Sequence, residues 1–144
     1  MKTNTIVMEP KEIQLENFLF LQDRIGIVAA LHELGSIKTS VAIKHSIIKT
    51  IRNIDECREA YVQTRAKIQE QYCKKDENGK LIIDKNKYVF DDPSKEKACT
   101  EEVIELANLK VPVKIFPVSE EELMANENIS ADLILRLGEF ASKQ

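Results

Sequence analysis

Apolar residues recur at helical spacing over most of the chain and alternate with polar residues in a few short segments. Within residues 11–15, Ile13 and Leu15 are separated by a polar residue, which predicts a short strand. Residues 17–34 follow helical spacing, and Gly35 ends the pattern as glycine commonly does after a helix. We therefore expect a strand followed by a helix.

The helix expected at residues 17–34 is apolar on two separate sides. Such a helix either lies in the centre of its domain or divides its two sides between the core and a partner. The first side consists of Phe18, Leu21, Ile25 and Val28. The second side, which we expect to form an interface, consists of Phe20, Ile27, Leu31 and Leu34.

Residues 37–72 predict an unusually long helix, whose apolar stripe has the alternating four- and three-residue spacing of a heptad seam. Two arginines occupy positions in this stripe, which runs Ile47, Ile51, Ile54, Arg58, Tyr61, Arg65, Ile68, Tyr72. The helix would be about 54 Å long at 1.5 Å per residue. Another part of the chain must therefore support its far end.

A polar stretch interrupts the helical pattern after this helix. The pair Asn78-Gly79 predicts a turn. Two β-prone runs joined by Lys85-Asn86 then predict a hairpin over residues 80–90. Because such a hairpin reverses the chain, we expect it to lie at the end of a helix pair.

The second helix of that pair is expected at residues 93–109. Asp92 is a suitable N-cap, and Pro93 suits the first helical position. The inner side of this helix is expected to carry Cys99, Val103, Leu106 and Ala107.

The C-terminal third predicts one strand and two helices. Residues 111–116 alternate, and Pro112 cannot donate a ladder hydrogen bond, so this is an edge strand that could pair with residues 11–15. Ser119 opens a capping-box helix, and a last helix is expected at residues 130–142.

Together these elements predict a mainly α protein with a small β component, folded as a single α+β domain over residues 1–144. Its centre is a long antiparallel helix pair tipped by a hairpin, with short edge strands and a C-terminal helix. The composition, 43% hydrophobic and 31% charged, is in the globular range. With neither an apolar leader nor a run of about 18 apolar residues, the chain is expected to be soluble and cytoplasmic. The odd number of cysteines, three, favours reduced thiols.

Charge is unevenly distributed along the chain. Residues 44–75 contain eight Lys or Arg and four Asp or Glu, whereas residues 91–144 contain six and twelve. These two regions are suited to pack on each other, within one chain or between two copies. The net charge of −3 and the acids mixed among the lysines argue against nucleic acid as a partner.

Candidate catalytic and metal-binding groups are few. His32 and His45 have no cysteine or carboxylate at metal-ligand spacing, and the sequence contains neither a CxxC motif nor a glycine-rich phosphate loop. We expect no catalytic residue, metal or cofactor, and hence a protein that is not an enzyme.

Arg58 and Arg65 are the most unusual polar residues, because both stand in an otherwise apolar seam about 10 Å apart. They could pair with acids of the helix at 93–109 such as Glu101, extend to water, or bridge two subunits. Alternatively they could form a pocket for a carboxylate or phosphate, with Tyr61 and Tyr72 beside it.

The order of the parts resembles a family of small phage proteins, the domain-of-unknown-function family numbered sixteen-seventeen of tailed phages that infect low-GC Gram-positive bacteria. The resemblance covers about residues 11–142 and rests chiefly on the segments "KKDENGKLIIDKNKY" and "VPVKIFPVSEEEL". It implies a phage or prophage origin and a role inside the infected cell, in the host cytoplasm. It implies no catalytic residues.

Three functions remain open from these observations. The first is a non-enzymatic phage accessory protein that forms a homo-oligomer and binds a host or phage protein, as an inhibitor or an assembly factor. The second is a small-ligand or nucleotide-sequestering protein that uses Arg58 and Arg65. The third is a structural component of the virion.

Overall fold

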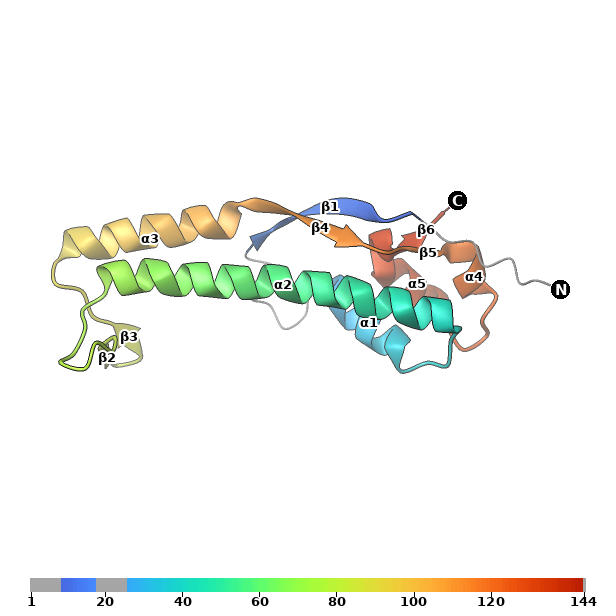
Figure 1. Ribbon diagram of the computed structural model, residues 1–144, viewed down its shortest axis with the longest axis horizontal. Helices are drawn as coiled ribbons and strands as arrows, with labels where there is room; N and C mark the ends of the chain where they lie inside the picture. Colours follow the sequence, from blue (N-terminus) through green and yellow to red (C-terminus); the bar gives the residue numbers. More distant parts are fainter. Residues whose placement is uncertain (1–8, 18–25, 144) are drawn as a thin grey trace.

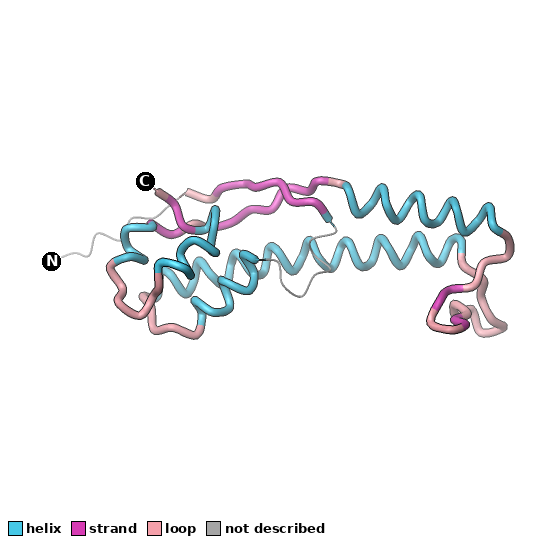
Figure 2. Tube along the Cα trace, turned by 180° about the vertical axis from the view of Figure 1, so that it is seen from behind, coloured by secondary structure: helices cyan, strands magenta, loops and turns pink. Residues whose placement is uncertain are grey.

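The computed structural model describes residues 9–17 and 26–143, and all statements below concern these residues. One long helix, α2 (Val41–Tyr72), runs along most of the molecule and gives it an elongated shape (Figure 1). At one end lie α1 (Gly26–Gly35), α4 (Glu120–Met124) and α5 (Ala131–Leu137). At the other end, here called the tip, lies a hairpin of β2 (Ile83–Asp84) and β3 (Lys87–Tyr88) (Figure 2). The mainly α fold with a small β component is confirmed.

The long helix begins at Val41, later than the expected residue 37. The reason is local, because the side chain of Ser40 accepts a hydrogen bond from the amide of Ile43 at 3.3 Å and so caps the helix. The helix ends at Tyr72, as the pattern of apolar residues predicts. Of its five buried residues, Ile47, Ile54 and Tyr61 belong to the expected seam, and Ile43 and Thr50 do not.

The second long helix, α3 (Pro93–Asn108), lies antiparallel beside α2, so the expected helix pair is confirmed (Figure 1). Asp92 caps it by accepting a hydrogen bond from the amide of Lys95 at 3.0 Å. At its other end the buried side chain of Asn17 donates to the carbonyl of Leu106 at 3.0 Å. The basic and acidic regions of the sequence thus pack on each other within one chain.

The expected pairing between the N-terminal strand and the edge strand is also confirmed. β1 (Lys11–Glu16) and β4 (Lys110–Ile115) are antiparallel, with Ile13 opposite Val113 and Leu15 opposite Val111. Val113 is 1% exposed and faces the core.

Helix α2 covers the edge of β4 that β1 leaves open. The Thr50 hydroxyl accepts from the amide of Phe116 at 2.9 Å, and the Asn53 amide donates to the carbonyl of Lys114 at 2.9 Å. The Cys57 thiol lies 3.9 Å from the carbonyl of Pro112. Backbone polar groups of strand residues two apart point to the same edge of the strand. Side chains of one helix can therefore reach the backbone groups of Pro112, Lys114 and Phe116.

The hydrophobic core lies at the end of the molecule opposite the tip, between α1, the first half of α2, β4 and the C-terminal helices. Its largest fully buried side chains include Phe140, Leu31, Leu34, Ile54 and Ile115. The expectation that Leu31 and Leu34 form an interface is therefore wrong, since α5 packs against α1 and both leucines are 0% exposed. Ile27 is partly buried against the same core.

The C-terminal segment differs from the helix expected at residues 130–142. Helix α5 ends at Leu137, and a single 3-10 turn (Gly138–Phe140) leads into β6 (Ala141–Ser142), which pairs in parallel with β5 (Val118–Ser119). Gly138 has φ +54° and ψ −122°, a conformation that glycine adopts most readily, and it ends the helix. The turn places Phe140 in the core with 0% exposure.

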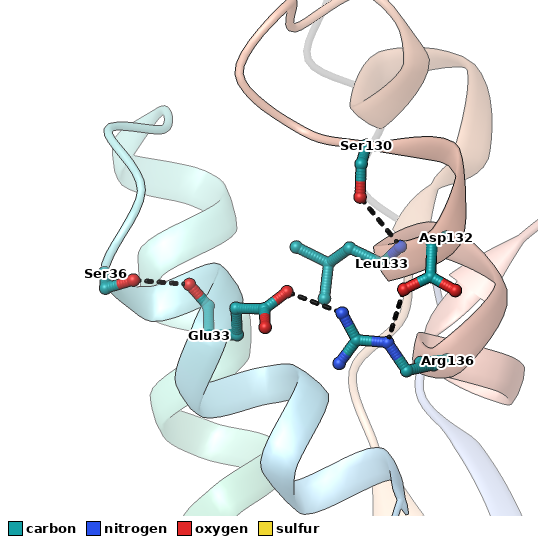
Figure 3. A network of polar contacts seen from close by, with 6 residues as sticks. All are labelled: Glu33, Ser36, Ser130, Asp132, Leu133 and Arg136. Atoms are coloured by element: carbon teal, nitrogen blue, oxygen red, sulfur yellow. Dashed lines mark hydrogen bonds and ion pairs between the residues drawn. The ribbon is translucent and has the colours of Figure 1, made fainter.

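Polar contacts on the surface connect α1 to α5 (Figure 3). The Arg136 guanidinium pairs with Glu33 at 2.7 Å and with Asp132 at 2.9 Å, and the two carboxylates raise its pKa above the ordinary value. The Ser130 hydroxyl caps α5 by accepting from the Leu133 amide at 3.1 Å. Because the arginine is largely solvated, the buried leucines beneath it dominate this contact.

Candidate functional site at the tip

A pocket of about 340 Å³ lies at the tip, where α2, the hairpin segment and α3 meet. Its volume is within the range of small-ligand sites, which begins near 300 Å³. Residues from all three parts line it: Arg65, Gln69, Cys73, Asn86, Lys87, Tyr88, Phe90, Glu96, Cys99, Thr100, Val103 and Ile104. We call this the tip pocket.

The hairpin wall of the pocket forms because α2 ends in an extended residue. Cys73 has φ −79° and ψ 150° and pairs as an antiparallel bridge with Phe90. The next residue, Lys74, donates its amide to the carbonyl of Val89 at 2.8 Å and accepts from the amide of Ile82 at 2.9 Å. The chain leaving α2 therefore lies between both halves of the returning hairpin segment and holds it beside the helix.

Two tight turns shape this segment, both at the positions that the sequence predicts. Asp76 accepts hydrogen bonds from the amides of Asn78 and Lys80 at 2.8 and 3.0 Å, and Gly79 takes φ +80°. At the hairpin itself, Lys85 and Asn86 have φ of 52° and 65°, as a type I′ turn requires.

Three large apolar side chains at the tip are exposed to solvent. Tyr88 and Ile104 line the pocket and are 38% and 54% exposed, and Ile83, the cross-strand partner of Tyr88, is 62% exposed. We call these three residues the apolar rim. The main core does not extend to them, and the hairpin is too short to bury its own side chains.

A polar contact connects the end of α2 to the middle of α3. The Tyr72 hydroxyl donates a hydrogen bond to the carboxylate of Glu102, which raises the pKa of the tyrosine. Arg65 lies in the pocket wall, half-buried, and its charge acts to lower the pKa of Cys99. Among the described residues no carboxylate forms an ion pair with Arg65.

The structure does not bring Arg58, Arg65, Tyr61 and Tyr72 into one pocket. Only Arg65 lines the tip pocket. Arg58 pairs with Asp55 of its own helix at 3.7 Å, and Tyr61 is buried in the core at 3% exposure. Tyr72 points to α3 instead, through Glu102. Phe20, from the expected interface, is outside the described residues.

The hairpin and α3 residues of the pocket were not expected as site residues. Their signal in the sequence was weak: Tyr88 belongs to a β-prone run, and Ile104 looks like an ordinary helix residue. Only the register of the hairpin against α3 brings the two together.

No metal site or membrane-spanning element is found in the described part of the chain. No group of three or more His, Cys, Asp or Glu side chains there could hold a metal ion. None of the helices in residues 9–17 and 26–143 has the length and apolar character needed to cross a bilayer.

No protein-family model, no curated protein and no solved structure matches this chain.

Proposed function

We propose that this protein is a non-enzymatic phage accessory protein, located in the host cytoplasm, that binds another protein through its tip. The observation that carries the proposal is the apolar rim: Tyr88 and Ile104 line the tip pocket, Ile83 pairs with Tyr88 in the hairpin, and all three are exposed. The phage origin rests on the family resemblance of the sequence. The free thiols of all three cysteines support a reducing compartment.

The apolar rim is suited to a protein partner because its side chains are exposed together. Single exposed apolar residues are normal on a surface, whereas clustered ones beside a pocket mark contact sites. A tyrosine and an isoleucine that border a depression also match the composition of interface centres, which are rich in aromatic residues.

Charge in the tip pocket favours an acidic group on the partner. Arg65 and Lys87 are cationic and line the pocket together with one carboxylate, Glu96. A half-buried guanidinium can form two parallel hydrogen bonds with a carboxylate. A partner that places an aspartate or glutamate next to an apolar side chain would complement both features.

Variants of the rim test this proposal. The purified wild-type chain should capture a protein from a host extract, and a tenfold excess of untagged chain should displace that protein. The chain carrying Tyr88→Asp and Ile104→Asp should no longer capture it. Leu135→Asp is the matched control, because Leu135 is 80% exposed at the opposite end of the molecule. Equal capture by the wild-type and rim variants, or loss with the control alone, would refute a binding role for the tip.

The alternative is a protein that sequesters a small anion, such as a nucleotide, in the same pocket. The pocket volume favours it, as does Arg65, which has no ion pair with any carboxylate in residues 9–17 and 26–143, but Arg58 would have no part. A melting temperature that rises with a purified nucleotide in wild type and not in Arg65→Met would establish this alternative. No rise with any nucleotide would leave the protein-binding proposal in place.

Self-association remains part of the proposal, but on another surface than α1. The outer face of α2 exposes Val41, Ile48 and Val62, and a shallow groove of about 410 Å³ there is lined by Ile48, Arg52 and acids that include Glu59. Along this face Arg52 precedes the acids Asp55, Glu56 and Glu59 in the sequence. An antiparallel copy of α2 would therefore place unlike charges opposite each other, as a two-fold interface requires.

Light scattering on the purified chain tests this part. A dimer that becomes a monomer in Ile48→Glu would support the α2 interface, and an unchanged dimer would exclude it.

A further inference from the structure

The buried side chains of the tip are two thiols. Cys73 is 6% exposed and Cys99 is 5% exposed, and neither belongs to the main hydrophobic core. Cys73 lies directly after α2, where it pairs with Phe90 of the hairpin segment, and Cys99 lies in the first half of α3. Both line the tip pocket, so one residue of each wall presents sulfur to the same cavity.

The two thiols are neighbours in the tip pocket. Each thiol shifts the pKa of the other: Cys99 raises the pKa of Cys73, and Cys73 lowers that of Cys99. Because both thiols line one pocket from neighbouring elements, side-chain rotation with backbone adjustment can bring the sulfurs to the bonded separation of about 2.05 Å. Burial alone does not explain why two cysteines, and not two aliphatic residues, occupy this position.

The third cysteine does not belong to this pair. Cys57 lies on α2 beside β4, where its thiol approaches the carbonyl of Pro112. It precedes Cys73 along the same helix by a distance of about 24 Å, at 1.5 Å per residue. The sequence therefore contains one matched pair and one separate thiol, which serves as an internal control.

We propose that Cys73 and Cys99 form a reversible intramolecular disulfide, with a low-molecular-mass disulfide such as glutathione disulfide as the oxidant. Intracellular disulfides of this kind are typically transient and redox-sensing. The inference concerns the thiol chemistry alone and does not depend on the function proposed above.

The reaction proceeds by two thiol–disulfide exchanges. The thiolate of Cys99 attacks one sulfur of the oxidant, which forms a mixed disulfide and releases one thiolate. The thiolate of Cys73 then attacks the Cys99 sulfur, which forms the protein disulfide and releases the second thiolate. Two electrons pass from the protein dithiol to the oxidant, and the two thiol protons end on the released thiols.

The surroundings of the pair favour Cys99 as the first nucleophile. Burial raises the pKa of both thiols, and the charge of Glu102 adds to this rise at Cys99, but the neighbouring Cys73 thiol and the charge of Arg65 act against it there. At Cys73, both burial and the neighbouring Cys99 raise the pKa. Because the thiolate is the reactive species and both pKa values remain raised, the oxidation rate should increase as the pH rises above neutrality.

The disulfide would join the two walls of the tip pocket. It would close a loop that contains the whole hairpin segment between Cys73 and Cys99, and a cross-link of that length restricts the unfolded chain substantially. For a chain of this size, we expect the melting temperature to rise by about 5–15 °C on oxidation.

The experiment uses the full-length purified chain, reduced and then equilibrated with glutathione disulfide in the absence of oxygen. Intact mass should fall by two hydrogen atoms, one thiol should remain open to alkylation, and peptide mapping should place the bond between Cys73 and Cys99. Dithiothreitol should restore the original mass and melting temperature.

Matched variants separate the pair from the remaining thiol. Cys57→Ser should oxidise as wild type does, whereas Cys73→Ser and Cys99→Ser should stop at a mixed disulfide with glutathione. Cys73→Ala and Cys99→Ala serve if a serine variant does not fold. Three alkylatable thiols in the oxidised wild type, or a bond that involves Cys57 or a second chain, would overturn the proposal.

Discussion

The contact between Thr50 and Phe116 allows a sharp test of how α2 supports the strand β4. Thr50 is 0% exposed, and its hydroxyl accepts a hydrogen bond from the Phe116 amide at 2.9 Å. The substitution Thr50→Val keeps the shape of the side chain and replaces the hydroxyl with a methyl group. The Phe116 amide would then lose its acceptor.

The expected cost follows from the burial of this amide. A buried donor without a partner costs about 1–3 kcal/mol, and the partial burial of Phe116 together with the added methyl group reduces this figure. We expect Thr50→Val to lower the free energy of unfolding by roughly 1–2 kcal/mol, which corresponds to a fall of about 3–8 °C in melting temperature.

The matched control is a threonine on the solvent side of the same helix. The Thr64 hydroxyl donates to the carbonyl of Ala60 at 2.8 Å, one turn earlier, and the residue is exposed. Thr64→Val should change the free energy of unfolding by less than about 0.5 kcal/mol. Urea unfolding gives both energies, and amide exchange measured by NMR should show a loss of protection at Phe116 only in Thr50→Val. Equal stability of the two variants with Phe116 still protected would refute this account of the strand edge.

Three further predictions concern stability. Ile54→Ala should cost about 2–5 kcal/mol in urea unfolding because Ile54 is 0% exposed, and Leu135→Ala on α5, 80% exposed, should cost less than about 0.5 kcal/mol. Gly138→Ala should cost about 1–3 kcal/mol because of its φ of +54°, whereas Gly35→Ala should be nearly neutral, and similar losses would argue against strain at Gly138. The hydrogen bond from the Lys95 amide lowers the pKa of the Asp92 carboxyl. The ionised cap therefore stabilises the fold fully above the ordinary aspartate pKa of about 3.9. This stabilisation is lost as the pH falls through the lower pKa that Asp92 has in the folded state. The stability of Asp92→Asn, measured by thermal unfolding, should therefore fall less between about pH 5 and about pH 2 than the stability of wild type does. Identical pH profiles of the two proteins would contradict this cause.

The local signals in the sequence were sufficient for most elements. Asp92 and Pro93 fix the start of α3, and Lys85-Asn86 takes the positive φ angles that a tight hairpin needs. These features depend on residues close together in the chain, so they can be recognised without knowledge of the packing. The strand pair β1–β4 was also expected, since Pro112 restricts its strand to an edge.

Features that depend on packing could not be recognised in the same way. Leu31 and Leu34 lie on a second apolar side of their helix, and only the position of α5 shows that this side is buried. Likewise the helical pattern continues past Leu137, but the backbone at Gly138 turns and brings Phe140 into the core.

The candidate site shows the same limit more strongly. A ligand site that joins Arg65 to Arg58 was one alternative that the sequence left open, because the two share a helical stripe. The pocket instead combines Arg65 with residues of the hairpin and α3, which are distant in sequence and have no common pattern. All three cysteines were expected as reduced thiols, and Cys73 and Cys99 line one pocket only because the hairpin returns the chain to the end of α2.

The claim that the tip is the binding surface is tested most directly by photo-crosslinking in the host cell. A benzophenone amino acid would replace Tyr88 at the tip or, as the matched control, Leu135 at the opposite end; both positions are exposed. The account predicts a discrete covalent adduct with one other protein from position 88, reduced by Arg65→Met, and none from position 135. An adduct from position 135 alone, or no adduct from position 88 in cells that contain the folded chain, would contradict it.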